Sequence, residues 1–151
     1  MIPILRQLFQ RDLTRLHDEI SAYKSEANLW ITSGEITNSG GNLCLHLVGN
    51  LNAFICGELG NSGYVRDRPA EFNAKNIPQE TLLRQVLETR ELVDQVLASL
   101  PAESLGKEYP KRIWKEGMTT GFFLTHLVSH LSYHLGQVNY HRRLLDKQSN
   151  G

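Results

Sequence analysis

Two long segments of this 151-residue chain contain no charged side chain, and they constrain the fold more than any other feature. Residues 36–57 and residues 117–141 lack Asp, Glu, Lys and Arg, so the 16 acidic and 16 basic residues all lie elsewhere. Neither segment is typical of a membrane span, because one contains four Asn and the other four His, and such residues are costly in hydrocarbon. We therefore expect both segments to be central elements of a soluble protein core.

Two further segments, residues 3–24 and 78–100, have the periodicity of amphipathic helices. Apolar side chains recur every three or four positions, at Leu5, Leu8, Leu13, Leu16 and Ile20 in the first and at Leu82, Val86, Val93, Val96 and Leu97 in the second. The uncharged segments add helices over about 40–58 and 119–145. Four long helices without a convincing alternating strand predict an all-α four-helix bundle.

The length of the chain fits one domain, and we expect a single domain over residues 1–151. Residues 28–36 are expected to form a loop. The connection over residues 59–77 is too long for an ordinary hairpin loop, which predicts a crossover along the bundle, a functional loop, or both.

The charge balance and the cysteine content limit the partners and the compartment. A formal net charge of zero lacks the positive surface that dominates binding to nucleic acid or to an anionic membrane, so we expect neither partner. Cys44 and Cys56, on one helix, would lie about 18 Å apart, too far for a disulfide. With no signal peptide visible after Met1, a cytoplasmic location is expected.

Histidines are concentrated on one side of the last predicted helix. With His126 at 0°, His130, His134 and His141 lie at about 40°, 80° and 60°, so all four share one stripe. Imidazoles one turn apart can converge on one cation, and His46 in the other uncharged helix is the obvious third donor. The alternative is that His46 is a buried histidine hydrogen-bonded within the core.

The motifs around these histidines resemble a known family. Residues 126–138 are similar to the last-helix signature of the DinB/YfiT-like superfamily, His-x-x-x-His-x-Gly-Gln, and His46 falls where that superfamily has its helix-two histidine. Residues 41–51, followed by 66–72, resemble a DinB-related branch catalogued as a domain of unknown function, DUF1572. The resemblance implies a four-helix bundle with a long crossover between helices two and three. It also implies a divalent metal held by His46, His130 and His134.

The implied site is typical of catalytic metal centres. Three neutral imidazoles leave the charge of a divalent ion uncompensated and leave positions open for water or substrate. The resemblance implies activation of a low-molecular-weight thiol, or of water, for transfer to an electrophilic small molecule, and a homodimer. Zinc or nickel is expected, with manganese or iron as other options. The alternative is a non-catalytic metal-binding or structural bundle whose histidines are satisfied by protein groups.

Other polar and aromatic residues have two interpretations each. A cluster of charged residues could bind an anionic cosubstrate as a polar rim, or its members could pair with one another: Arg66, Asp67, Arg68 and Glu71. Tyr133 and Gln137 lie on the histidine stripe and contact a ligand, or they pack between helices. His126 and His141 are expected to contact the metal ligands or to belong to the core. Trp30 and Trp114 are expected to pack, and neither cysteine is expected to be catalytic.

Overall fold

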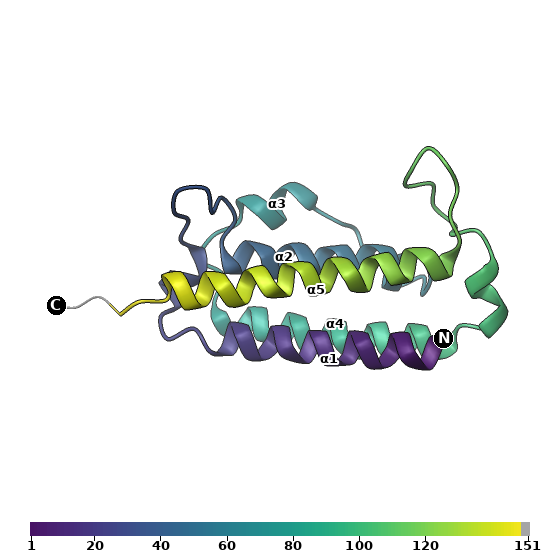
Figure 1. Ribbon diagram of the computed structural model, residues 1–151, viewed down its shortest axis with the longest axis horizontal. Helices are drawn as coiled ribbons and strands as arrows, with labels where there is room; N and C mark the ends of the chain where they lie inside the picture. The colour runs from purple at the N-terminus through teal and green to yellow at the C-terminus, as the bar shows by residue number, and fades with distance from the viewer. Residues whose placement is uncertain (149–151) are drawn as a thin grey trace.

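Long helices lying side by side dominate the computed structural model, which describes residues 1–148 (Figure 1). The long helices are α1 (Ile2–Ser21), α2 (Gly40–Leu51), α4 (Gln79–Ser99) and α5 (Thr120–Leu145), and a short helix, α3 (Arg68–Asn73), lies in the connection between α2 and α4. Within the described residues, extended pairing is limited to two isolated bridges, Ser33 with Ile36 and Glu108 with Thr119. The prediction of an all-helical chain is confirmed.

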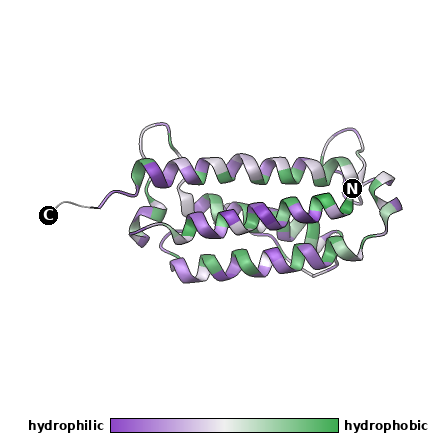
Figure 2. Cartoon of the chain, turned by 60° about the horizontal axis from the view of Figure 1, so that its bottom comes forward, coloured by the Kyte–Doolittle hydropathy of each residue, from purple (hydrophilic) through white to green (hydrophobic). Residues whose placement is uncertain are grey.

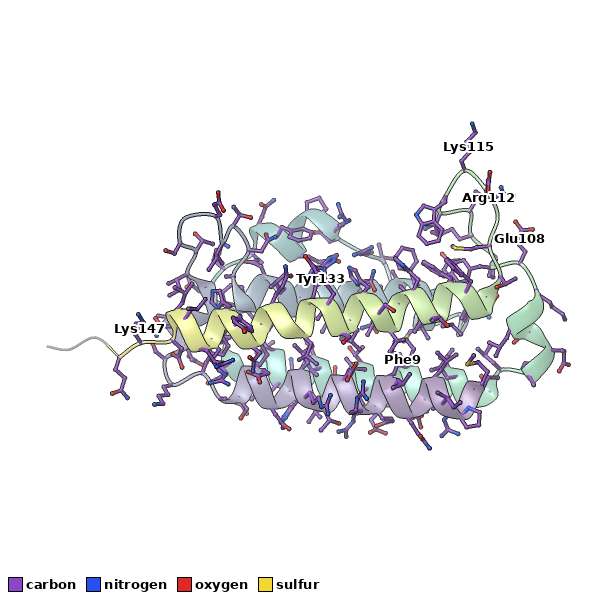
Figure 3. The ribbon with its side chains drawn as sticks, viewed as in Figure 1. Phe9, Glu108, Arg112, Lys115, Tyr133 and Lys147 are labelled. Atoms are coloured by element: carbon purple, nitrogen blue, oxygen red, sulfur yellow. The ribbon has the colours of Figure 1, made fainter. Side chains whose placement is uncertain are left out.

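The long helices form two pairs. Helix α1 lies against α4 and also contacts α5, while α2 contacts α5 and α4 (Figure 1). Figure 2 shows hydrophobic and hydrophilic residues interspersed along the long helices that lie in front, as expected of amphipathic helices around a shared core. Phe9 of α1 is buried and points toward α5 (Figure 3). The segment that joins α4 to α5 projects past the helix ends and carries Glu108, Arg112 and Lys115 at its surface (Figure 3).

Helix α2 carries no charged side chain, so its burial leaves no charge to be satisfied within the core. The Ser39 side chain accepts a hydrogen bond from the Asn42 amide nitrogen at 3.2 Å and so caps the first turn. All residues of α2 except Leu45 are buried. At its end the helix continues as a π-helical turn, Asn52–Gly57, so the helix predicted over 40–58 is present with a change of pitch.

The other uncharged segment is not buried on all sides. Helix α5 buries Phe123, Leu127 and Leu131, yet Phe122 and Tyr133 on its outer face are 60% and 66% exposed. Both segments contribute to the core as expected, but α5 also has an exposed outer face. A helix face without charged residues can be buried, but the lack of charge does not by itself cause burial.

Helix ends depend on contacts from distant parts of the chain. The helix predicted over 3–24 ends at Ser21, because the backbone amides of Lys24 and Ser25 donate to the Asp146 carboxylate at 2.8 and 3.4 Å. Residues 28–36 were expected to form a loop, but a 3₁₀ turn over Glu26–Trp30 occupies the start of that segment and buries Trp30. The connection over 59–77 contains α3, which Asp67 caps by accepting from the Ala70 amide at 3.1 Å. In residues 1–148 no helix combines the length and apolarity needed to cross a membrane.

Substitution of alanine for two helical glycines is expected to change the free energy of unfolding in opposite directions. A Cβ at Gly41 would approach the Trp30 ring to 2.7 Å, whereas a Cβ at Gly136 on α5 would meet nothing within 4 Å. Overpacking should make Gly41→Ala less stable by about 1–3 kcal/mol. Better helix propensity should make Gly136→Ala more stable by about 0.5–1 kcal/mol. Urea unfolding of the two variants checks this, and equal shifts of the same sign would contradict the packing of Trp30 on α2.

Candidate metal centre

Helices α2 and α5 bring three histidines together. His46 comes from α2, and His130 and His134 come from successive turns of α5. One ring nitrogen from each lies within 4.8 Å of the others, so the group could hold a metal ion. The Nε2 atom of His130 is 3.2 Å from Nε2 of His46 and 3.1 Å from Nε2 of His134.

These separations match those of ligands on a shared ion. Imidazole nitrogens bound at 2.0–2.1 Å in tetrahedral geometry lie about 3.3 Å apart. The three rings are also steeply inclined to one another, with interplanar angles of 76°, 86° and 89°. Inclined rings can direct their lone pairs at one point from three directions.

The outer nitrogens of two histidines are held by acceptors. His46 Nδ1 donates to Glu71 Oε1 at 3.0 Å, and His134 Nδ1 contacts Gln137 Oε1 at 2.6 Å. An ionised carboxylate can only accept, so in neutral His46 the proton is on Nδ1 and the Nε2 lone pair faces inward. A partner on the outer nitrogen is the usual arrangement for a metal-binding histidine.

His130 provides the test of whether these residues fit a metal. Its Nδ1 is buried and has no hydrogen-bond partner among residues 1–148. If the proton of the neutral His130 ring is on Nε2, it must be shared between the Nε2 lone pairs of His46 and His134. If the proton is on Nδ1 instead, the Nε2 lone pairs of the three rings face one another. No placement of protons satisfies all three inward Nε2 atoms, whereas a cation would satisfy each of them and would leave only the Nδ1–H of His130 without a partner among residues 1–148. The donor set therefore fits a metal ion.

Burial keeps the imidazoles in the form that binds metals. Desolvation lowers the pKa of His130 to about 4, with the neighbouring His134 and His46 adding to the effect. Desolvation also lowers the pKa of His46, although its hydrogen bond to Glu71 opposes the shift. Both rings are neutral at pH 7, so a metal need not displace a proton from them.

Glu71 is the buried acid behind His46. Its side chain is 6% exposed, and Arg66 donates to both of its oxygens at 2.9 Å. A Cβ at residue 49 would collide with this carboxylate, so Gly49 leaves the space through which Glu71 reaches α2. Arg66 and Glu71 therefore pair with each other, and the interpretation of these two residues as an anion-binding rim is wrong. Sequence reasoning found Glu71 but missed its bond to His46.

The group lies between apolar side chains and the surface of α5. Leu43, Leu47, Leu127 and Leu131 are all at most 3% exposed. His130 and His134 are only half-buried, and the exposed Tyr133 ring is 5.2 Å from that of His134 (Figure 3). Solvent therefore reaches the group from the α5 side, while the buried leucines close the opposite side.

The remaining histidines lie outside the group. His141 is buried between the Tyr23 hydroxyl at 2.6 Å and the Ile31 carbonyl at 2.8 Å, so it belongs to the core as expected. His126 is exposed and stacks on Phe123, with ring centroids 5.9 Å apart. It lies outside the core, and its ring stacks with that of His130 at a centroid distance of 6.3 Å, in line with the expected position next to a metal ligand.

Two of the other candidate residues lie next to His134. The Gln137 side chain contacts its Nδ1 atom, whereas the Tyr133 ring only lies beside the imidazole. Cys44 and Cys56 are free and buried, and desolvation raises the pKa of each thiol to about 12, so neither is suited to act as a nucleophile. Trp114 is 41% exposed but contacts the ring of Phe123 at a centroid distance of 5.8 Å, in line with a packing role.

Comparison with models of known protein families gives a match over nearly the whole chain. The family model described as a protein of unknown function (DUF1572) matches residues 3–150. No curated protein matches the chain significantly.

Proposed function

We propose that this chain, which belongs to the DUF1572 family, holds one divalent metal ion with His46, His130 and His134. The ion would lower the pKa of a bound small thiol, or of water, and make it a nucleophile toward an electrophilic small molecule. The observation that carries the proposal is the convergence of three imidazole Nε2 atoms, in which Nε2 of His130 lies 3.1 and 3.2 Å from the other two.

The chain's own residues would orient and shield the reacting groups. Glu71 fixes the His46 ring, and Gln137 holds the outer nitrogen of His134. The leucines behind the group exclude water and so strengthen its electrostatics. No protein nucleophile is required. In the thiol reaction, the thiol would release its proton to water and its sulfur would form the S–C bond. The C–Cl or epoxide C–O bond would break, with the electron pair going to chloride or to an alkoxide that takes a proton from water.

The nature of the ligands favours some metals over others. A site of three nitrogen donors suits borderline cations, so zinc or nickel is proposed, with manganese and iron as further options. The nearest carboxylate, Glu71, bonds to His46 Nδ1 and to Arg66, so it is engaged as a hydrogen-bond partner. This arrangement differs from a di-iron centre, which uses Glu side chains as ligands from several helices.

We further propose the DinB/YfiT-like fold, with α1, α2, α4 and α5 as the bundle and the α3 segment as the crossover. Antiparallel pairing of α1 with α4 and of α2 with α5 supports this. A homodimer is proposed because the outer face of α5 exposes Phe122, Tyr133 and Tyr140 without a charge between residues 117 and 141. A reducing, cytoplasmic location is proposed because both cysteines are free.

The proposed activity is tested with a panel of cellular thiols and a chloroaromatic or epoxide acceptor. Turnover should disappear after treatment with a chelator and return when a divalent metal is added. An ester and an amide tested without thiol reveal whether water is the nucleophile instead. Bound metal without turnover in either assay would favour the non-catalytic metal-binding alternative.

A further inference from the structure

A cavity lies apart from the three histidines, between α2, the α3 segment and α4. Its volume is about 460 Å³, within the range of about 300–1,000 Å³ in which organic ligands bind. The described residues that line it include Glu71 but none of the three histidines. Because Glu71 contacts the Nδ1 side of His46, the cavity is on the far side of that ring from the converging Nε2 atoms.

Most of the cavity wall is apolar. Leu45 and Val48 come from α2, Leu92 comes from α4, and Val65 and Ile77 come from the segments on either side of α3. Val65 is 88% exposed, so it forms part of the opening rather than of the core. Such a wall would bind the apolar body of a ligand by removing it from water.

Several polar groups of the cavity offer acceptors, among them the buried Oε1 of Gln85, although the Tyr64 hydroxyl and the Gln85 amide nitrogen in the lining can donate. The amide nitrogen of Asn52 already donates to the Val48 carbonyl at 2.8 Å and to Thr89 Oγ1 at 2.9 Å. Thr89 Oγ1 in turn donates to the Gln85 carbonyl at 2.7 Å. These bonds use the donors of Asn52 and Thr89, so a ligand is offered oxygen acceptors there.

The charge of the lining is negative. Asp67, Glu71 and Glu88 line the cavity, and no Lys, Arg or His is among the described lining residues. Arg66 neutralises Glu71 from outside the cavity. Within residues 1–148, Glu88 has one ion pair, an exposed and weak contact with Arg84 at 3.7 Å, and Asp67 uses one oxygen to cap α3. Asp67 and Glu88 therefore remain available to a cation.

We propose that this cavity binds a small molecule with an apolar body and one protonated amine. The apolar body lies against the side chains of α2 and α4, and the ammonium group lies toward Asp67 and Glu88. This site does not depend on the proposed metal centre, so its failure would leave that proposal intact.

Three probes of nearly equal size test the inference: 2-phenylethylamine, 2-phenylethanol and phenylacetate. Binding is measured by calorimetry, with and without chelator, and mapped by chemical-shift changes. The amine should bind about 5- to 10-fold more tightly than the alcohol, as expected for contacts with exposed carboxylates. The anion should bind most weakly. The shift changes should cluster on residues that line the cavity.

Two variants separate the contributions of shape and charge. Asp67→Asn/Glu88→Gln keeps the α3 cap and removes both charges, so the amine should lose its advantage over the alcohol. Ala74→Phe fills the cavity and should weaken all three probes. The control Asp18→Asn/Glu91→Gln changes exposed acids elsewhere and should behave as the unaltered protein. Equal affinities for the three probes, no binding, or an unchanged amine preference in the charge variant would overturn the proposal.

Discussion

A His130→Ala/His134→Ala variant is expected to lose its divalent metal, from about one ion per chain to nearly none. Two of the three ligands would disappear, and one imidazole with water does not retain a divalent ion against dialysis. Metal content is measured by elemental analysis on protein purified without a histidine tag. His46→Ala should also lose metal, because it removes the only one of the three ligands on α2.

The matched control is His17→Ala. His17 is on α1 and contacts Asp18 at 3.4 Å, outside the three-histidine group, so its removal should leave the metal content unchanged. Circular dichroism checks that each variant keeps its helices. Undiminished metal in the double variant would refute the ligand assignment, and an equal loss in His17→Ala would indicate adventitious binding.

A Glu71→Ala variant is expected to bind metal about 10- to 100-fold more weakly. Loss of an outer hydrogen-bond partner usually lowers metal affinity by that factor, because the ring loses its orientation and its basicity. The 3.0 Å bond to His46 Nδ1 is the contact removed. The affinity is measured by competition with a chromophoric chelator, and Glu91→Ala on exposed α4 is the control.

A second variant separates this effect from simple destabilisation. Glu71→Ala leaves the guanidinium of Arg66, whose side chain is 17% exposed, without its partner, and an unpaired charge of this kind destabilises the fold. Glu71→Ala/Arg66→Met removes that charge and should recover stability against urea. It should not recover metal affinity, since His46 still lacks its acceptor. Recovery of both would show that Glu71 acts only on the fold.

Which residues share one face of a helix could be predicted from the sequence. His130 and His134 are four positions apart, and the geometry of an α-helix places such residues on one face whatever surrounds them. The same periodicity predicted four long helices, and the absence of charge predicted that α2 would be buried. Pairing of His46 with this stripe was a hypothesis from the sequence, and the structure brings the three residues together.

Contacts between elements were decided only by the tertiary structure. Glu71 follows His46 by 25 positions through an irregular connection, and no local periodicity relates residues across such a distance. Its approach depends on α3, on Arg66 and on the space at Gly49, all of which arise from packing. The early end of α1 likewise depends on Asp146 from the opposite end of the chain. Helical periodicity is a property of the local backbone, whereas these contacts form only when separate elements pack together, so the sequence determined the stripe of histidines and the tertiary structure decided what supports it.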